Sequence, residues 1–140
     1  MRYSLYFEDA EKHERVIRTF LLKHSTTIRL NEVTWTEYVF FKRKKYGGAA
    51  DPLFMEQFLK LHPSFIKKSG RHYFFHLSPQ LKKMLNKATL IWKVSPPNKH
   101  FYGFEDPTFF RNDALIGHVI SHEPIIILDA TPTELKKMRI

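Results

Sequence analysis

Residues 114–129 read ALIGHVISHEPIIILD, and this stretch decides the class of fold. It contains two segments rich in apolar and β-branched residues, Ala114 to His122 and Pro124 to Asp129, which predict two strands joined tightly at Glu123. Parallel neighbours need a crossover of a dozen or more residues, so a connection this short favours antiparallel pairing. The sequence therefore predicts a sheet that is mixed or mainly antiparallel.

The rest of the chain alternates between strand and helix patterns. Strand-like segments occupy residues 2–7, 26–30, 32–44, 71–77, 89–94 and 100–104. Asn31 suits a turn, so 26–30 and 32–44 predict a hairpin. Residues 64–70 and 103–113 are expected to be loops, the second with a turn at Asp106-Pro107.

Helices are predicted at 10–24, 53–62 and 78–87, and from Thr131 to the C-terminus. The segment 10–24 has apolar residues at helical spacing and charges on the opposite side. Asp51-Pro52 and Ser78-Pro79 each combine an N-cap residue with proline at the first helical position. Thr131-Pro132-Thr133-Glu134 adds the glutamate of a capping box.

Composition and element order together predict one α+β domain over residues 1–140, with about 5–7 strands and 3–4 helices packed on the sheet. The chain has no cysteine, which rules out a disulfide framework and a thiolate metal site. The longest apolar run, Ile125 to Leu128, is far too short to cross a membrane. We therefore expect a cytoplasmic protein with no membrane partner and no cofactor.

Positive charge is concentrated in the middle of the chain. Residues 57–104 hold nine Lys or Arg and no Asp or Glu, and residues 38–104 sum to +11 against +9 for the whole chain. Such localised charge favours an anionic partner. The alternative is that these cations form a solvated surface that binds no partner.

Four adjacent cations, Lys42 to Lys45, are the most concentrated part of this charge. Lys42, Arg43, Lys44 and Lys45 precede Gly47-Gly48, so a bendable loop could present them to phosphates. They could equally protect a strand end from edge-to-edge pairing.

The segment Arg71 to Leu77 predicts a strand with two different faces. Alternation places Tyr73, Phe75 and Leu77 on one face and His72, Phe74 and His76 on the other. If the first face is core, the second presents Phe74 between two histidines, a surface suited to base stacking or phosphate contact. With Lys67, Lys68 and Arg71, these residues complete the predicted polyanion-binding set. The competing interpretation is that both faces of this strand are buried.

Three functions are consistent with these features. The first is a binding domain of the bacterial or phage cytoplasm that contacts nucleic acid or another polyanion. The second is a regulatory or immunity-type protein that docks an acidic protein partner through anchors such as Trp35, Trp92 or Tyr102. No motif names a family, and no phosphate loop or nucleophile elbow occurs.

The third is a small metal-dependent hydrolase or nuclease, in which His118, His122, Asp106 and Asp113 would act as acids, bases or metal ligands. His118 and His122 share a strand face but lie about 13 Å apart, too far to bind one metal. We therefore assign no catalytic residue and no metal site from the sequence, and an enzyme is the less favoured class.

Overall fold

The computed structural model describes residues 2–32, 64–87, 104–120 and 123–140. These residues form one seven-stranded sheet in the order β1-β7-β6-β5-β2-β4-β3, and every neighbouring pair is antiparallel. The α+β class and the antiparallel sheet are therefore confirmed. The predicted strand 89–94, the helix 53–62 and most of the segments 32–44 and 100–104 lie outside the described residues.

The strands are short and alternate with helices along the chain. They are β1 (Arg2–Tyr6), β2 (Thr27–Glu32), β3 (Phe65–Ser69), β4 (His72–His76), β5 (Phe104–Arg111), β6 (Ala114–Ile120) and β7 (Ile125–Asp129). The helices are α1 (Phe7–Glu11), α2 (Glu14–His24), α5 (Pro79–Asn86) and α6 (Pro132–Lys137).

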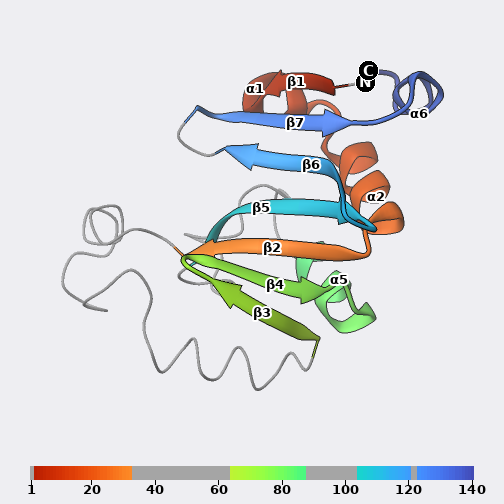
Figure 1. Cartoon of the computed structure of the whole chain (residues 1–140). Helices are drawn as coiled ribbons and strands as arrows, with labels where there is room; N and C mark the ends of the chain where they lie inside the picture. The colour runs from red at the N-terminus through yellow and green to blue at the C-terminus, as the bar shows by residue number, and fades with distance from the viewer. Residues whose placement is uncertain (1, 33–63, 88–103, 121–122) are drawn as a thin grey trace.

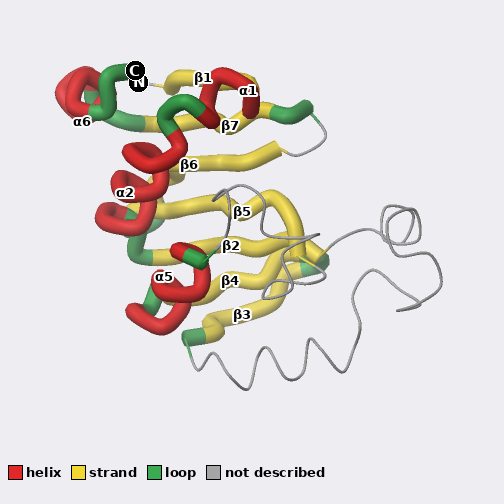
Figure 2. Tube along the Cα trace, turned by 180° about the vertical axis from the view of Figure 1, so that it is seen from behind, coloured by secondary structure: helices red, strands yellow, loops and turns green. Residues whose placement is uncertain are grey.

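Helices α2 and α5 lie on one face of the sheet, behind it in Figure 1 and in front of it in Figure 2. The core fills the space between them and the sheet, and its fully buried side chains include Ile17, Leu21, Ile28, Leu30, Phe75, Leu81, Leu85 and Phe109. Among the described residues, no helix packs on the opposite face of the central strands, which we call the open face.

Gly117 brings α2 close to β6. An added Cβ at this position would lie 2.5 Å from Cδ2 of Leu21, which is closer than carbon atoms approach in a packed interior. A larger residue here would force Leu21 to shift, because helix and sheet are in tight contact at this point. The contact lies on the closed face of the sheet, within the core.

Several local predictions are confirmed. Strands β6 and β7 pair as the opening segment predicts. Ser78 caps α5 by accepting a hydrogen bond from the amide of Leu81 at 3.2 Å. Thr131 and Glu134 form the predicted capping box of α6.

Two predictions about strands and loops are wrong, and one predicted helix is confirmed only over residues 14–24. Asn31 is not a turn, because β2 continues through it and pairs with β4 on one side and β5 on the other. Residues 65–69 are not a loop but the edge strand β3, whose pairing to β4 is irregular between Phe65 and Lys67. The predicted helix 10–24 is interrupted at Lys12 and His13, so that residue 10 belongs to α1.

The segment 104–111 is also a strand, although Asp106-Pro107 predicts a turn. The register between β2 and β5 shifts here, since Arg29 pairs with Thr108 while Asn31 pairs with Glu105, which leaves one extra residue on β5. Asp106 takes a φ of 51°, which Asp tolerates better than most residues. A bulge also accepts Pro107, which has no amide to donate. The Asp-Pro pair thus makes a bulge instead of a turn.

No helix among the described residues has the length and apolar character needed to cross a membrane.

Candidate functional site on the open face of the sheet

Strand β4 places its aromatic side chains on two different faces, as the alternation predicts. Tyr73 and Phe75 are buried beneath the helices, at 5% and 0% exposure. His72 and Phe74 are partly exposed on the open face, and His76 is exposed there. This face assignment fixes which residues can meet a ligand.

One residue from each of five neighbouring strands forms a straight row across the open face. Phe74 of β4 lies opposite Lys67 of β3 and opposite Arg29 of β2. Arg29 lies opposite Thr108 of β5, which in turn lies opposite His118 of β6. We call these five residues the cross-strand row. Paired side chains on one face of a sheet are close enough to interact directly.

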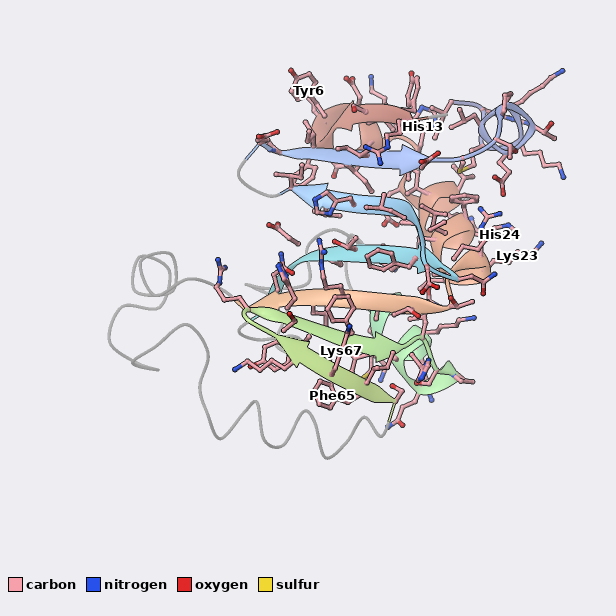
Figure 3. All side chains as sticks on the ribbon, viewed as in Figure 1. Tyr6, His13, Lys23, His24, Phe65 and Lys67 are labelled. Carbon is pink, nitrogen blue, oxygen red and sulfur yellow. The ribbon has the colours of Figure 1, made fainter. Side chains whose placement is uncertain are left out.

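Aromatic rings and a lysine line a shallow groove at one end of this row. The ring centroids of Phe74 and Phe110 are 6.4 Å apart, and Nζ of Lys67 lies 5.1 Å from the centroid of Phe74. Figure 3 shows Lys67 on the side of β3 that faces the viewer, which is the open face. The groove has a volume of about 370 Å³ and is lined by Thr27, Ile66, Lys67, Phe74, His76, Phe110 and Asp113.

Polar side chains occupy the centre of the row. Nη2 of Arg29 donates to Oγ1 of Thr108 at 3.2 Å, and this hydroxyl lies 2.8 Å from Nδ1 of His118. Thr108 is fully buried, so its hydroxyl depends on these partners. The guanidinium of Arg29 also lies 5.9 Å from the centroid of Phe110, which joins the polar centre to the aromatic groove.

Burial and the Arg29 charge determine the protonation of this centre. Burial lowers the pKa of Arg29, against the opposing effect of the Asp106 carboxylate. The pKa of His118 is lowered by burial first and then by Arg29, while Asp106 opposes the shift. His118 is therefore neutral at pH 7, and Arg29 supplies the positive charge of the centre.

His72 is held at the other end of β4. Its Nδ1 lies 2.6 Å from Oδ1 of Asn31, the residue opposite it on β2. Burial and the nearby Arg29 and Arg71 lower the pKa of His72. His72 therefore contributes hydrogen bonding to the open face but no charge at neutral pH.

The predicted polyanion-binding residues do not all share this face. Lys67 lies over Phe74 on the open face, whereas the adjacent Lys68 lies over Tyr73, 5.3 Å from its centroid, on the helix side. Arg71 is exposed in the turn between β3 and β4. The cluster Lys42, Arg43, Lys44 and Lys45 lies outside the described residues.

The lysines of the acid-free stretch are likewise divided between the two layers. Lys82 and Lys83 belong to α5, and Lys87 caps its C-terminus, so all three lie on the helix side of the sheet. A single basic face made from the whole stretch is therefore absent among the described residues.

The residues of the hydrolase hypothesis are only partly brought together. Asp106 is near enough to influence His118 electrostatically. Asp113 lies in the turn between β5 and β6, about 16 Å along β6 from His118. Within the described ranges, no group of three His, Asp or Glu side chains is placed to hold a metal ion. His122 and the proposed protein-docking anchors Trp35, Trp92 and Tyr102 lie outside those ranges.

Three residues of this face were not identified from the sequence: Arg29, Thr108 and Phe110. The alternation Ile28-Arg29-Leu30 contained a usable signal, because two buried apolar residues flank an arginine that must face the other way. Thr108 and Phe110 sat in a segment expected to be a loop. Their place beside Arg29 depends on strand order, which local pattern does not reveal.

Comparison of the chain with protein-family models, with curated protein sequences and with solved structures found no match.

Proposed function

We propose that the protein binds single-stranded nucleic acid across the open face, with bases stacking on Phe74 and Phe110. The observation that carries this proposal is the cross-strand row itself. Phe74 is partly exposed and lies between two cations, Lys67 on one side and Arg29 on the other. Proteins that hold unpaired strands combine aromatic stacking surfaces with cations that track the backbone.

Stacking can displace the lysine that now covers the ring. An exposed cation–π contact such as that of Lys67 with Phe74 contributes about 0.5–1 kcal/mol. Base stacking on an aromatic side chain contributes about 1–3 kcal/mol. The flexible lysine can then turn to a phosphate. Ligand binding thus forms a base–Phe74 stack and a Lys67–phosphate contact, and breaks only the weak contact between Lys67 and Phe74.

The charges of the open face favour one path for a strand. Among the described residues, Asp106 lies near one end of β5 on the side of Arg29 away from Phe74, and Asp129 lies on β7. Asp113, in the turn after β5, lines the groove together with Lys67 and Phe74. A strand crossing at Phe74 meets Lys67 on one side of the ring and Arg29 on the other. The chain's net charge of +9 adds a long-range attraction for any polyanion.

An unpaired strand suits this face better than a duplex does. Stacking requires bases that are free of their own partners, and a partly exposed ring set in a sheet can reach only such bases. Duplex readers place a helix or a two-stranded ribbon in a groove, and among the described residues the open face carries no projecting element of this kind.

Adjacent lysines on opposite faces give a matched test. Lys67→Gln and Lys68→Gln each remove one charge from β3, but only Lys67 faces the groove. Binding of a short fluorescein-labelled oligothymidylate would be followed by anisotropy between about 50 and 200 mM salt. We expect Lys67→Gln to weaken binding and to reduce the salt slope by about 1, and Lys68→Gln to change both much less.

Equal effects of the two substitutions would refute binding at the open face. Affinity of the unmodified protein that does not change with salt would refute phosphate contact altogether. A labelled duplex of the same length measures the preference for an unpaired strand, and tighter binding to the duplex would contradict the proposal.

A further inference from the structure

Arg29 is a partly buried arginine with no carboxylate partner among the described residues, unlike three other arginines of that region. Arg18 pairs with Glu14 at 2.9 Å, Arg111 with Glu134 at 3.2 Å, and Arg2 with Asp129 at 3.6 Å. Asp106 influences Arg29 electrostatically, but no acid of the described residues lies within ion-pair distance of its guanidinium. A partly buried cation without a counter-charge is unusual in a folded protein.

The hydrogen-bonding capacity of this guanidinium is also largely unused. It carries five N–H donors. One of its nitrogens, Nη2, donates to Thr108, whereas Nε is buried and has no hydrogen-bond partner. The planar donor arrangement of arginine matches two oxygens of a phosphate. Arg29 therefore lacks both the charge and the acceptors that an oxyanion would supply.

We infer that Arg29 is the phosphate-binding residue of the open face and holds a phosphodiester group of the nucleotide stacked on Phe74. This inference rests on the proposed function, because it assigns one contact of the same ligand. Lys67 and Arg29 lie on the two strands that flank β4, about 10 Å apart across the sheet. A stacked nucleotide has one phosphate on each side, and each cation takes one of them.

The side chains around Arg29 hold its guanidinium in a position to bind a phosphate. Thr108 accepts from Nη2 and is itself within hydrogen-bond distance of His118, so the guanidinium is anchored at one end. His118 is neutral, so it adds no second cation beside Arg29. The bulge keeps Asp106 on β5, two residues before Thr108 and on the side of Arg29 away from Phe74. Asp106 is thus not on the side of Arg29 that faces Phe74.

The experiment compares two ligands with the same bases and different backbones. Oligothymidylate carries phosphates, and a thymine peptide nucleic acid of equal length carries none. Arg29→Gln should weaken binding of oligothymidylate roughly ten- to a hundredfold, the loss expected for a charged hydrogen bond, and change binding of the uncharged analogue little. Arg29→Lys keeps the charge but not the two-pronged geometry, so it should recover only part of the affinity.

Arg2→Gln is the matched control. Arg2 is an arginine of the far edge strand β1, four strands from Arg29, and it pairs with Asp129. Its loss should change affinity for either ligand only slightly. Thermal unfolding of each variant checks that the fold is intact, and Arg29→Lys decides the question if Arg29→Gln does not fold.

Three results separate this inference from the proposed function. If Phe74→Ala weakens binding of both ligands while Arg29→Gln has no more effect than Arg2→Gln, the phosphate role of Arg29 is wrong and stacking stands. If Phe74→Ala has no effect either, the proposed function fails. Displacement of oligothymidylate by poly-glutamate as readily as by unlabelled oligothymidylate would identify a carboxylate site and overturn the assignment to phosphate.

Discussion

The contact between Gly117 and Leu21 allows the packing of α2 on the sheet to be tested quantitatively. In the Gly117→Ala variant the new Cβ would lie 2.5 Å from Cδ2 and 3.4 Å from Cδ1 of Leu21. Carbon atoms in contact are normally about 3.5–4.0 Å apart, so the overlap with Cδ2 is roughly 1 Å. Leu21 is fully buried and has no exposed space to enter.

Two opposing terms set the size of the effect. Overpacking a core by one methyl group costs about 1–3 kcal/mol. Replacing glycine by alanine in a strand returns about 0.5–1 kcal/mol of conformational entropy. The difference between these ranges is about 0–2.5 kcal/mol, so we expect Gly117→Ala to lower the free energy of unfolding by about 1 kcal/mol. Urea denaturation would show this as a lower midpoint at an unchanged slope.

A double-mutant cycle identifies the cause of this loss. Leu21→Ala alone should cost about 2–5 kcal/mol, but it removes the clashing methyl groups, so Gly117→Ala should cost little in that background. Gly70→Ala is the control, because its loss comes only from a φ of 59° and no atom lies within 4 Å of the added Cβ. An unaltered or raised stability of Gly117→Ala, or an equal penalty with and without Leu21, would refute the close packing of α2 on β6.

Three further predictions concern charge and capping. Because the folded pKa of His118 is below 6.5 while the unfolded chain titrates near 6.5, protons bind preferentially to the unfolded state, and stability should fall as pH drops below 6.5. In His118→Asn this part of the pH dependence should vanish from urea titrations, and an identical pH profile would contradict the burial of a neutral His118. Thr131→Ala should lower the midpoint of thermal unfolding, because removing the cap of α6 costs about 0.5–2 kcal/mol. Thr133→Ala, at an exposed position of the same helix, is the control, and equal midpoints for the two variants would count against the capping box. Arg29→Met should raise the free energy of unfolding by roughly 0.5–2 kcal/mol, because the substitution removes a partly buried cation that has no carboxylate partner among the described residues. A clear loss of stability would show that Arg29 stabilises the fold.

Local sequence signals were sufficient wherever structure depends on neighbours along the chain. The capping residues of α5 and α6 and the tight connection of β6 to β7 were predictable because a cap or a short turn involves only a few consecutive residues. The two faces of β4 followed from simple alternation.

Predictions failed where pairing across the sheet overrides local preference. Asn31 favours turns, yet it lies inside β2 because both of its sides are occupied by strands. Residues 65–69 are largely exposed and carry no core pattern, but an edge strand needs only one neighbour. Asp106-Pro107 has the composition of a turn and forms a bulge because the strand resumes at once on its far side.

The candidate site could be predicted only in part, for the same reason. His72, Phe74, His76 and Lys67 were identified from one strand and its basic surroundings. The row that joins Phe74 to Arg29 and His118 depends on β2 lying between β4 and β5, although those strands are far apart in the chain. The count of charges along the sequence did not predict a shared basic face, because Lys67 and Lys68 are adjacent in sequence but lie on opposite faces of the sheet.

Photochemical crosslinking tests the central claim most directly, because it identifies the residues that touch a base. The protein would be irradiated with a single-stranded oligonucleotide containing 5-iodouracil, and crosslinked peptides would be sequenced by mass spectrometry. The account predicts crosslinks at Phe74 or Phe110, reduced by unlabelled oligothymidylate and lost in the Phe74→Ala, Phe110→Ala double variant. Crosslinks confined to the helix side, for example at Tyr73 or along α5, would contradict it.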